Sequence, residues 1–596
     1  MEYYRNLVDF YTLQSDVVKS EQCKIDCELY RKAFYNKEMW AIGMYDSSSK
    51  MQSGILSGNL AEFGDFNQCI NIEVNIENGT AFRGKHVLVT LSGYIMFTPF
   101  PFQIQHGLPM EQFPYLNYPR RPLPSHRWAI CVPDSCNLDE IVSHLKLYMA
   151  RDNFTSISEA IENTLDSQWE LRDYDWITIS VFIVIGVLLV VQTTYDTYLH
   201  YTKKKTKHWS LTAFSALSNG RRLVATSNRP ELLPCLDGIR CICMAWILLG
   251  HETESTMLTP SLIAAILCHI SIIRLIGTGP MYQTSMKGLD INCRNNWWQS
   301  LLYVSNYVDT YKICVPQSWY LCVDTQLQWL SPLLLLPVVW WKKCAYYLFG
   351  ILAIVGTGVV WYIAYDNKLI PNAEPSEYLA LYHTATHCRI TPWVMGHALA
   401  YFIYQNRNKK FNIPMWLATL LWVLALSLGA YATFGMYPIG LPDYEYNRPY
   451  MSYYMAMSTL FYCLASSWII FACIFNYGGI MNWFLSLPMW QVLSKLSYAM
   501  FLTHFALQMA FHATIKTPTW FSKINLFYSF CGLTGTTLVV ALIWTLSFEM
   551  PFMVIDAQVF RKNVSKSAPQ NQMTLPTIAV PKNESASSNN GNGSSL

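Results

Sequence analysis

Charged residues are scarce in this chain. Asp, Glu, Lys and Arg form only 14% of its 596 residues, while hydrophobic residues form 52%. Soluble domains average about 25% charged residues. The shortage excludes an ordinary soluble protein, because much of the chain must lie where charge is energetically unfavourable. The 21 tryptophans and 38 tyrosines suit the aromatic belts at membrane–water interfaces. The formal net charge of +3 indicates no nucleic-acid partner.

No apolar run of membrane-spanning length occurs before residue 176. Residues 1–175 are therefore predicted to form a globular head, in which the alternation HVLVTL at 86–91 indicates a strand. Apolar runs of spanning length recur from residue 176 onward. Residues 561–596 consist largely of Ser, Asn, Gly and Pro. That composition cannot bury enough apolar area to offset the ordering entropy, so we predict a disordered tail.

The head combines cysteines with two N-glycosylation sequons, at Asn78 and Asn153. This combination predicts an oxidising compartment and some disulfide bonds, although buried free thiols are the alternative. The disulfide candidates are Cys23, Cys27, Cys69, Cys131 and Cys136. Their number is odd, so one thiol is left without a partner within the head, and the spacing does not give the connectivity. No Cys or His pairs repeat with zinc-ligand spacing, and no metal site is predicted.

Apolar runs long enough to cross a bilayer number about ten, at roughly 20 residues each. They lie at 177–198, 236–252, 260–278, 319–340, 344–364, 389–405, 413–433, 454–475, 489–511 and 526–549. The predicted fold class is therefore a mainly α-helical, polytopic membrane bundle with a disulfide-containing N-terminal head of mixed structure. The first transmembrane helix is assigned to 176–200, and 201–235 is a linker before the membrane domain at 236–560.

Basic clusters orient these spans. Lys203, Lys204 and Lys205 follow the first span, so the linker is predicted to be cytosolic, the head extracellular or lumenal and the tail cytosolic. The membrane would be the plasma membrane or the endoplasmic reticulum. The first residues (MEYYR) are not a signal peptide. Either an exon precedes them or the first span carries the head across, and the preceding exon is favoured.

Counting the spans from the two ends gives different topologies. Counting back from the tail places 279–318 outside, where Cys293 and Cys314 could form a disulfide. Counting forward from the head places 279–318 inside. The two counts differ by one crossing. Either an odd number of spans is missing between about 252 and 278, or 260–278 does not cross, since it contains His269 and Arg274.

Arg240 and His251 lie in one predicted span, eleven residues apart. Three helical turns separate them, so they share a face about 16 Å apart along the axis. A charge and an imidazole on one face of an apolar span are unfavourable unless they face an interior cavity. The alternative is an arginine that snorkels and a histidine at the membrane boundary, and the spacing alone does not decide between the two.

The pattern LDGIR at 236–240 followed by His251 resembles the signature of the acyltransferase-3 family of integral membrane O-acyltransferases. Later landmarks resemble that family in the same order: WYLCVDTQ at 319–326, SPL at 331–333, RITP at 389–392, LSY at 496–498 and THF at 503–505.

The head has its own resemblance. WAIGMYD at 40–46, SGILSGN at 53–59, GDFNQC at 64–69 and CVPDSC at 131–136 are similar to the extracellular domain of the nose-resistant-to-fluoxetine proteins. That animal family joins such a head to an acyltransferase-3 membrane domain, and the resemblance covers roughly residues 20–560. Family members carry one more span between His251 and about Ser261, which implies a deletion near 252–261, where the two counts disagree.

The resemblance implies transfer of an acyl group from a thioester donor such as acyl-CoA to a hydroxyl acceptor, with no permanently bound cofactor. His251 suits the base that takes the hydroxyl proton, and Arg240 suits binding of the donor phosphate or carbonyl. Asp324 would orient the imidazole or position the acceptor, and His504 is a second candidate base. The predicted substrate-binding residues are Tyr320, Gln326 and Arg389.

Two other functions remain open. One is uptake or transport of lipids and hydrophobic small molecules across an epithelium, a role associated with the nose-resistant-to-fluoxetine proteins. The other is an inactive homologue. Retention of Arg240 and His251 favours the enzyme, whereas the missing span favours the inactive homologue, because a cavity that lacks one wall cannot exclude water.

Overall fold

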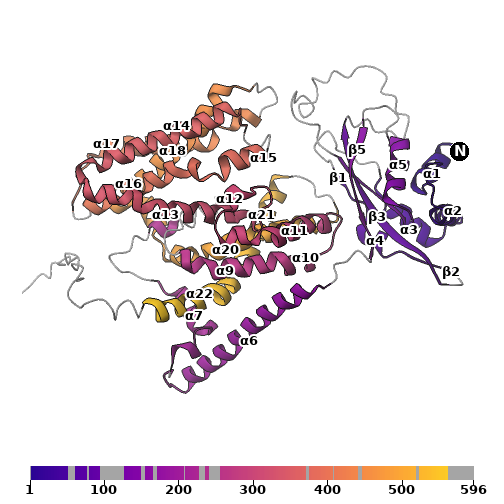
Figure 1. Cartoon of the computed structure of the whole chain (residues 1–596), viewed down its shortest axis with the longest axis horizontal. Helices are drawn as coiled ribbons and strands as arrows, with labels where there is room; N and C mark the ends of the chain where they lie inside the picture. Colours follow the sequence, from indigo (N-terminus) through magenta and orange to yellow (C-terminus); the bar gives the residue numbers. More distant parts are fainter. Residues whose placement is uncertain are drawn as a thin grey trace, which may run out of the picture.

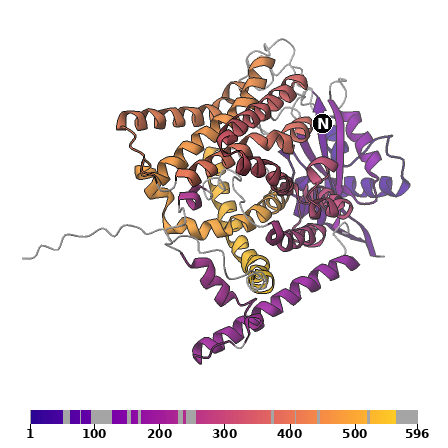
Figure 2. The same cartoon turned by 60° about the vertical axis from the view of Figure 1, so that its left-hand side comes forward.

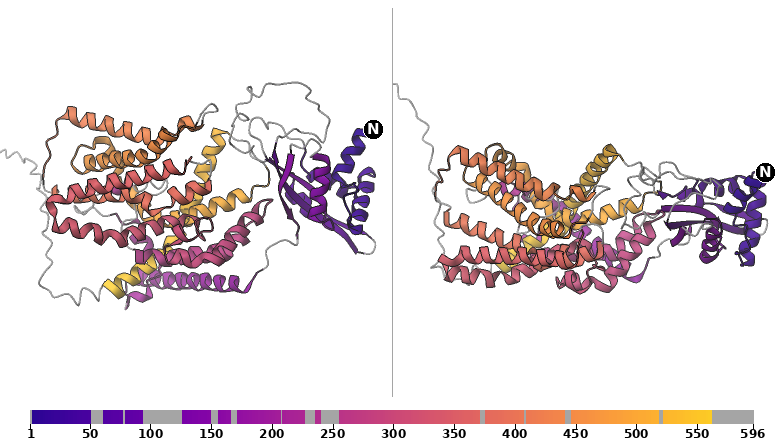
Figure 3. Two further views of the ribbon diagram at one scale, coloured as in Figure 1. Left: turned by 45° about the horizontal axis from the view of Figure 1, so that its top comes forward. Right: turned by 90° about the horizontal axis from the view of Figure 1, so that it is seen from above.

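The computed structural model describes most of the chain. The described residues are 2–50, 61–76, 79–93, 126–149, 155–165, 171–206, 208–226, 235–239, 255–370, 375–406, 409–440, 446–517 and 522–561. The head lies at one end of a helical bundle, as Figure 1 and both views of Figure 3 show.

The head is a sheet covered by helices. Its strands are β1 (Ala61–Glu62), β2 (Glu73–Ile76), β3 (Gly79–Gly93), β4 (His126–Pro133) and β5 (Thr155–Asn163). Strand β3 pairs antiparallel with β2, β4 and β5, and β1 joins β4 in parallel. The helices are α1 (Glu2–Tyr11), α2 (Glu21–Tyr35), α3 (Met39–Ser47), α4 (Phe66–Ile70) and α5 (Leu138–Met149). The strand predicted at 86–91 is thus the centre of the sheet.

The alternation along β3 separates its two faces. Val87 and Val89 pack with Phe10 and other residues of α1, α2 and α5 in one core. Leu88 packs on the opposite face with Phe63 and against Met281, which belongs to the membrane part of the chain. Strand β3 therefore connects the core of the head with the bundle.

Further polar contacts hold the head on the bundle. The side-chain amide of Asn163 donates to the carbonyl of Pro280 at 3.2 Å. Lys516 donates to the side-chain oxygen of Asn67 at 2.7 Å. Residues 280 and 516 consequently mark the end of the bundle that faces the head.

The membrane part is a multi-pass bundle of helices. They are α6 (Asp173–Tyr201), α7 (Ala216–Val224), α9 (Ser255–Leu267), α10 (Ile273–Leu275), α11 (Tyr282–Leu301), α12 (Ser305–Val308), α13 (Trp319–Trp340), α14 (Ala345–Asp366), α15 (Pro375–Tyr378), α16 (Ile390–Asn406), α17 (Met415–Phe434), α18 (Arg448–Ile474), α19 (Gly479–Leu485), α20 (Pro488–Ala513), α21 (Lys523–Trp544) and α22 (Met550–Asp556). Figure 2 shows α6 along one edge of the bundle.

Six helical segments among the described residues are long and apolar enough to span a membrane. They are Asp173–Tyr201, Pro316–Trp340, Lys342–Asp366, Met415–Phe434, Arg448–Ile474 and Lys523–Val559, and a shorter apolar helix covers Thr259–Leu275. The predicted spans at 389–405 and 489–511 correspond to α16 and α20. Most of the predicted span 236–252 lies outside the described residues.

Helix α11 occupies much of the segment predicted as the loop 279–318. It lies against α9 and α10, and one of its faces buries Tyr282, Met286, Leu289 and Cys293. These residues recur at helical spacing. Because the rest of the helix is polar, it gave no membrane-span signal.

The buried charge in the segment 260–278 has partners. Arg274 and Asp175, at the start of α6, are both fully buried and form an ion pair. His269 donates from Nδ1 to the carbonyl of its own helix at Ala265, at 2.8 Å. Arg274 and His269, the two polar side chains that argued against a span at 260–278, therefore both have partners inside the protein.

The cysteine pairing was not predictable from spacing. Disulfides join Cys23 to Cys136 and Cys69 to Cys131. The disulfide predicted for Cys293 and Cys314 is confirmed, with Cα atoms 3.9 Å apart. Cys27, also a candidate, is the buried free thiol that the odd number required, because Cys136 is already bonded to Cys23.

Candidate functional site

Several predicted residues lie outside the described part of the chain. These are the proposed base His251, the proposed donor-binding Arg240 and the glycosylation sites Asn78 and Asn153. The described beginning of the LDGIR motif explains its glycine. A Cβ atom at Gly238 would lie 2.2 Å from the carbonyl oxygen of Leu485, so any side chain there would collide with the end of α19.

A polar cluster lies at the first turns of α13. The side-chain amide of Gln326 donates to the carbonyl of Tyr303 at 2.8 Å and to the side-chain oxygen of Asn306 at 2.9 Å. Asn306 donates in turn to the hydroxyl of Thr386 at 2.9 Å, and this hydroxyl donates back to Gln326 at 2.5 Å. The hydrogen bonds of the Gln326 side chain thus connect α12, α13 and the segment before α16.

Arg389 is fixed beside this cluster. Its guanidinium donates twice to the carbonyl of His383, at 2.6 and 3.2 Å, and lies over the rings of Trp319 and Tyr382. Burial, and then the charge of Arg389, lower the pKa of His383 to about 4. His383 is therefore neutral near pH 7, and Arg389 supplies the positive charge of this group.

Tyr320 and His504 both contact the aromatic ring of Phe501. The ring of Phe501 has its centroid 6.0 Å from that of Tyr320 and 6.1 Å from that of His504. Nδ1 of His504 donates to the carbonyl of Phe501 at 2.8 Å. That hydrogen bond leaves Nε2 as the nitrogen able to accept a proton.

Asp324 belongs to the same side of α13 as Tyr320, because residues four apart share a helix face. Its carboxylate accepts a hydrogen bond from Gln328 at 3.4 Å. The structure thus brings Tyr320 and His504 to the contact between α13 and α20 around Phe501, with Asp324 one turn further along α13, while Gln326 and Arg389 form the separate cluster near α16.

The sequence prediction missed Glu549. This residue is 8% exposed and ends the π-helical turn Thr545–Glu549 between α21 and α22. The signal was present in the sequence, since an acidic residue inside a long apolar segment is a functional-site hypothesis by default.

The fold and the disulfides define a multi-pass membrane protein with an oxidised N-terminal domain. Residues 23–145 match the family model described as "Nose resistant-to-fluoxetine protein, N-terminal domain". The chain is also 20% identical to nose resistant to fluoxetine protein 6 of Caenorhabditis elegans over an alignment of 675 residues, which covers 91% of this chain and 81% of the relative. The chain is therefore similar to the nose-resistant-to-fluoxetine proteins, and residues 23–145 match the N-terminal domain of that family. No solved structure gives a significant match.

Proposed function

We propose that this protein is a membrane O-acyltransferase that moves an acyl group from a thioester donor such as acyl-CoA to a hydroxyl acceptor. The observation that carries the proposal is the contact between α13 and α20. There His504, whose Nε2 is left to accept a proton, and Tyr320 both lie against the ring of Phe501, and Asp324 lies on the same face of α13 as Tyr320. A base, a hydroxyl and a carboxylate are the groups that this chemistry requires.

The proposed reaction needs one proton acceptor. His251, or His504 in its place, takes the proton of the acceptor hydroxyl. The hydroxyl oxygen then attacks the thioester carbonyl carbon, and the carbon–sulfur bond breaks. The thiol leaves with the proton that the imidazole returns.

The other residues have supporting roles in this reaction. Arg240 holds a phosphate or the carbonyl of the donor, and Arg389 supplies a second fixed positive charge. Asp324 orients the imidazole or the acceptor, Tyr320 donates a hydrogen bond, and Gln326 fixes the first turns of α13.

The proposed orientation places the head and residues 279–318 outside and the tail in the cytosol, in the plasma membrane or the endoplasmic reticulum. Disulfides in the head and between Cys293 and Cys314 support an oxidising environment on that side. The basic cluster Lys203–Lys205, which follows the end of α6 away from the head, supports a cytosolic linker.

The experiment measures acyl transfer by the full chain in nanodiscs that contain cell lipids. Labelled palmitoyl-CoA is added, and free CoA and acylated products are quantified by mass spectrometry. His251→Ala or His504→Ala should lower the rate by about 10²–10⁴-fold, according to which histidine is the base. His512→Ala is the matched control, because His512 is exposed at the end of the same helix as His504. If wild-type protein releases no CoA, or if both variants react as fast as the control, the proposal is wrong.

A further inference from the structure

Glu549 is a buried acid in the middle of the membrane-spanning bundle. Its neighbour Phe548 contacts Phe182 of α6, with ring centroids 5.2 Å apart. On the following turn Phe552 packs on Phe214, at 6.0 Å, and the backbone of Phe214 donates to Gln192 of α6. Glu549 therefore lies between the levels of residues 182 and 192, well inside the apolar stretch of α6.

Among the described residues, only one of the two carboxyl oxygens of Glu549 has a hydrogen-bond partner. Oε2 accepts from the hydroxyl of Thr545 at 3.1 Å, and Ser261 lies beside the same carboxyl group. Ser261 is held in place by the indole N–H of Trp544, which donates to it at 2.7 Å. Among the described residues Oε1 has no hydrogen-bond partner, and none of them forms an ion pair with this side chain. A buried oxygen without a partner is unfavourable unless something else supplies one.

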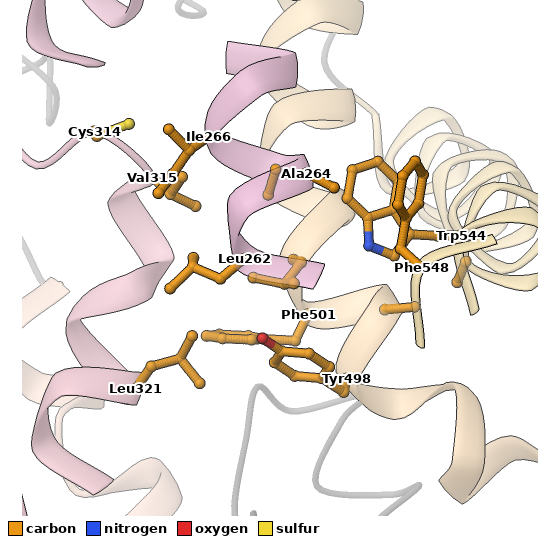
Figure 4. Close-up of a cluster of buried hydrophobic side chains, with 14 of the residues drawn as sticks. Leu262, Ala264, Ile266, Cys314, Val315, Leu321, Tyr498, Phe501, Trp544 and Phe548 are labelled. Carbon is orange, nitrogen blue, oxygen red and sulfur yellow. The ribbon is translucent and has the colours of Figure 1, made fainter. Parts of the chain in front are cut away.

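The surroundings of Glu549 are otherwise mostly aromatic and aliphatic, and the phenol of Tyr498 is a further polar group near it. Trp544, Phe548 and Leu262 belong to one core cluster with Tyr498 and Phe501. Figure 4 shows these side chains converging from α9, α20, the end of α21 and the π-helical turn that follows it. The backbone at Glu549 is also irregular, and π-helical turns occur frequently at functional sites.

Taking the proposed acyl transfer as the starting point, we propose that Oε1 of Glu549 accepts the hydrogen bond of the acceptor hydroxyl group when the acceptor binds, before the histidine takes that proton, and that the acceptor is a lipid-soluble alcohol. A single free acceptor atom among aromatic and aliphatic side chains matches a molecule with one hydroxyl group on an apolar body. A sugar would bury several hydroxyl groups that this environment leaves without partners, which is unfavourable.

The test is photo-labelling of the full chain in phosphatidylcholine nanodiscs. The probe is a long-chain primary alcohol that carries a diazirine and an alkyne, and its methyl ether, which cannot donate a hydrogen bond, is the comparison. The alcohol should label peptides around Glu549 and Ser261 at least tenfold more strongly than the ether. Glu549→Gln, which keeps the side-chain size but replaces Oε1 or its equivalent with an amide donor, should remove the difference.

Ser547→Ala is the matched control in the same turn, because the hydroxyl of Ser547 is already bonded to the carbonyl of Ile543. Glu549→Asp is the second variant if Glu549→Gln does not fold. It keeps the carboxyl group but withdraws it by one methylene, so labelling should be reduced. Folding is checked by size-exclusion chromatography and by oxidation of Cys293 with Cys314.

Equal labelling by alcohol and ether, or unchanged labelling of Glu549→Gln, overturns the inference. The two proposals fail differently. Glu549-dependent alcohol binding without release of CoA would refute the acyl transfer and leave the alcohol site standing. Acyl transfer to a sugar with normal rates in Glu549→Gln would refute the alcohol site and leave the transfer standing.

Discussion

The buried ion pair between Arg274 and Asp175 should be essential for joining the first membrane helix to the bundle. Both side chains are fully buried, so replacing Asp175 with Asn leaves an uncompensated guanidinium inside the protein. Breaking a buried pair in this way typically costs about 3–5 kcal/mol. Domains unfold with free energies of only about 5–15 kcal/mol, so the loss is a large fraction of the total.

The neighbouring charges provide the comparison. Arg172 also reaches this region, pairing with Asp290 at 3.4 Å, but its side chain is 38% exposed. Asp290 is fully buried but keeps its ion pair with Arg294 at 2.7 Å, so loss of the partly exposed Arg172 should cost only about 1 kcal/mol. A double replacement, Asp175→Leu with Arg274→Met, removes both charges while keeping their volume, and such replacements are often neutral.

The assay is thermal unfolding of the detergent-solubilised chain, followed by fluorescence-detected size exclusion. At roughly 2–4 °C per kcal/mol for a medium-sized domain, Asp175→Asn should lower the midpoint by about 6–20 °C. Arg172→Ala should change it by a few degrees at most, and the double replacement should recover most of the loss. A midpoint for Asp175→Asn equal to that of Arg172→Ala would refute the reasoning.

Three further predictions concern the head. Cys23→Ser should leave Cys136 bonded to Cys27, whose sulfur lies 3.6 Å from that of Cys136; non-reducing peptide mapping checks this, and a free Cys136 would contradict it. Burial lowers the pKa of His86 to about 4 from its ordinary value of 6.5. The contribution of neutral, buried His86 to the stability of the head is therefore complete above pH 6.5 and is lost as the pH falls from 6.5 toward 4. Limited proteolysis should therefore cut the head faster at pH 4.5 than at pH 7, and His86→Gln should weaken that dependence. Glycosylation should occur at Asn78 and not at the three sequons of the C-terminal tail, at Asn563, Asn583 and Asn592; mass spectrometry that finds the reverse would invert the proposed orientation.

Composition alone indicated the membrane class, because a bilayer restricts its spanning segments to apolar helices whose length is visible in the sequence. Apolar runs of spanning length likewise predicted α6, α13 and α14. It missed α11, because that helix is polar and buries only a narrow stripe against its neighbours. The strand at 86–91 was visible for a similar reason, since alternate residues of β3 enter different environments.

The pairing of residues far apart in the chain was decided by the tertiary structure. Spacing could predict a disulfide between Cys293 and Cys314, only 21 residues apart, but not one between Cys23 and Cys136, which are separated by 113. The sequence showed Arg274 as an unexplained charge, and only the packing of α10 on α6 supplied its partner 99 residues away. An apolar run indicates that a segment is buried, but it does not indicate which residues the segment contacts. Those contacts depend on how the helices assemble, because no local sequence pattern gives the distance between two helices.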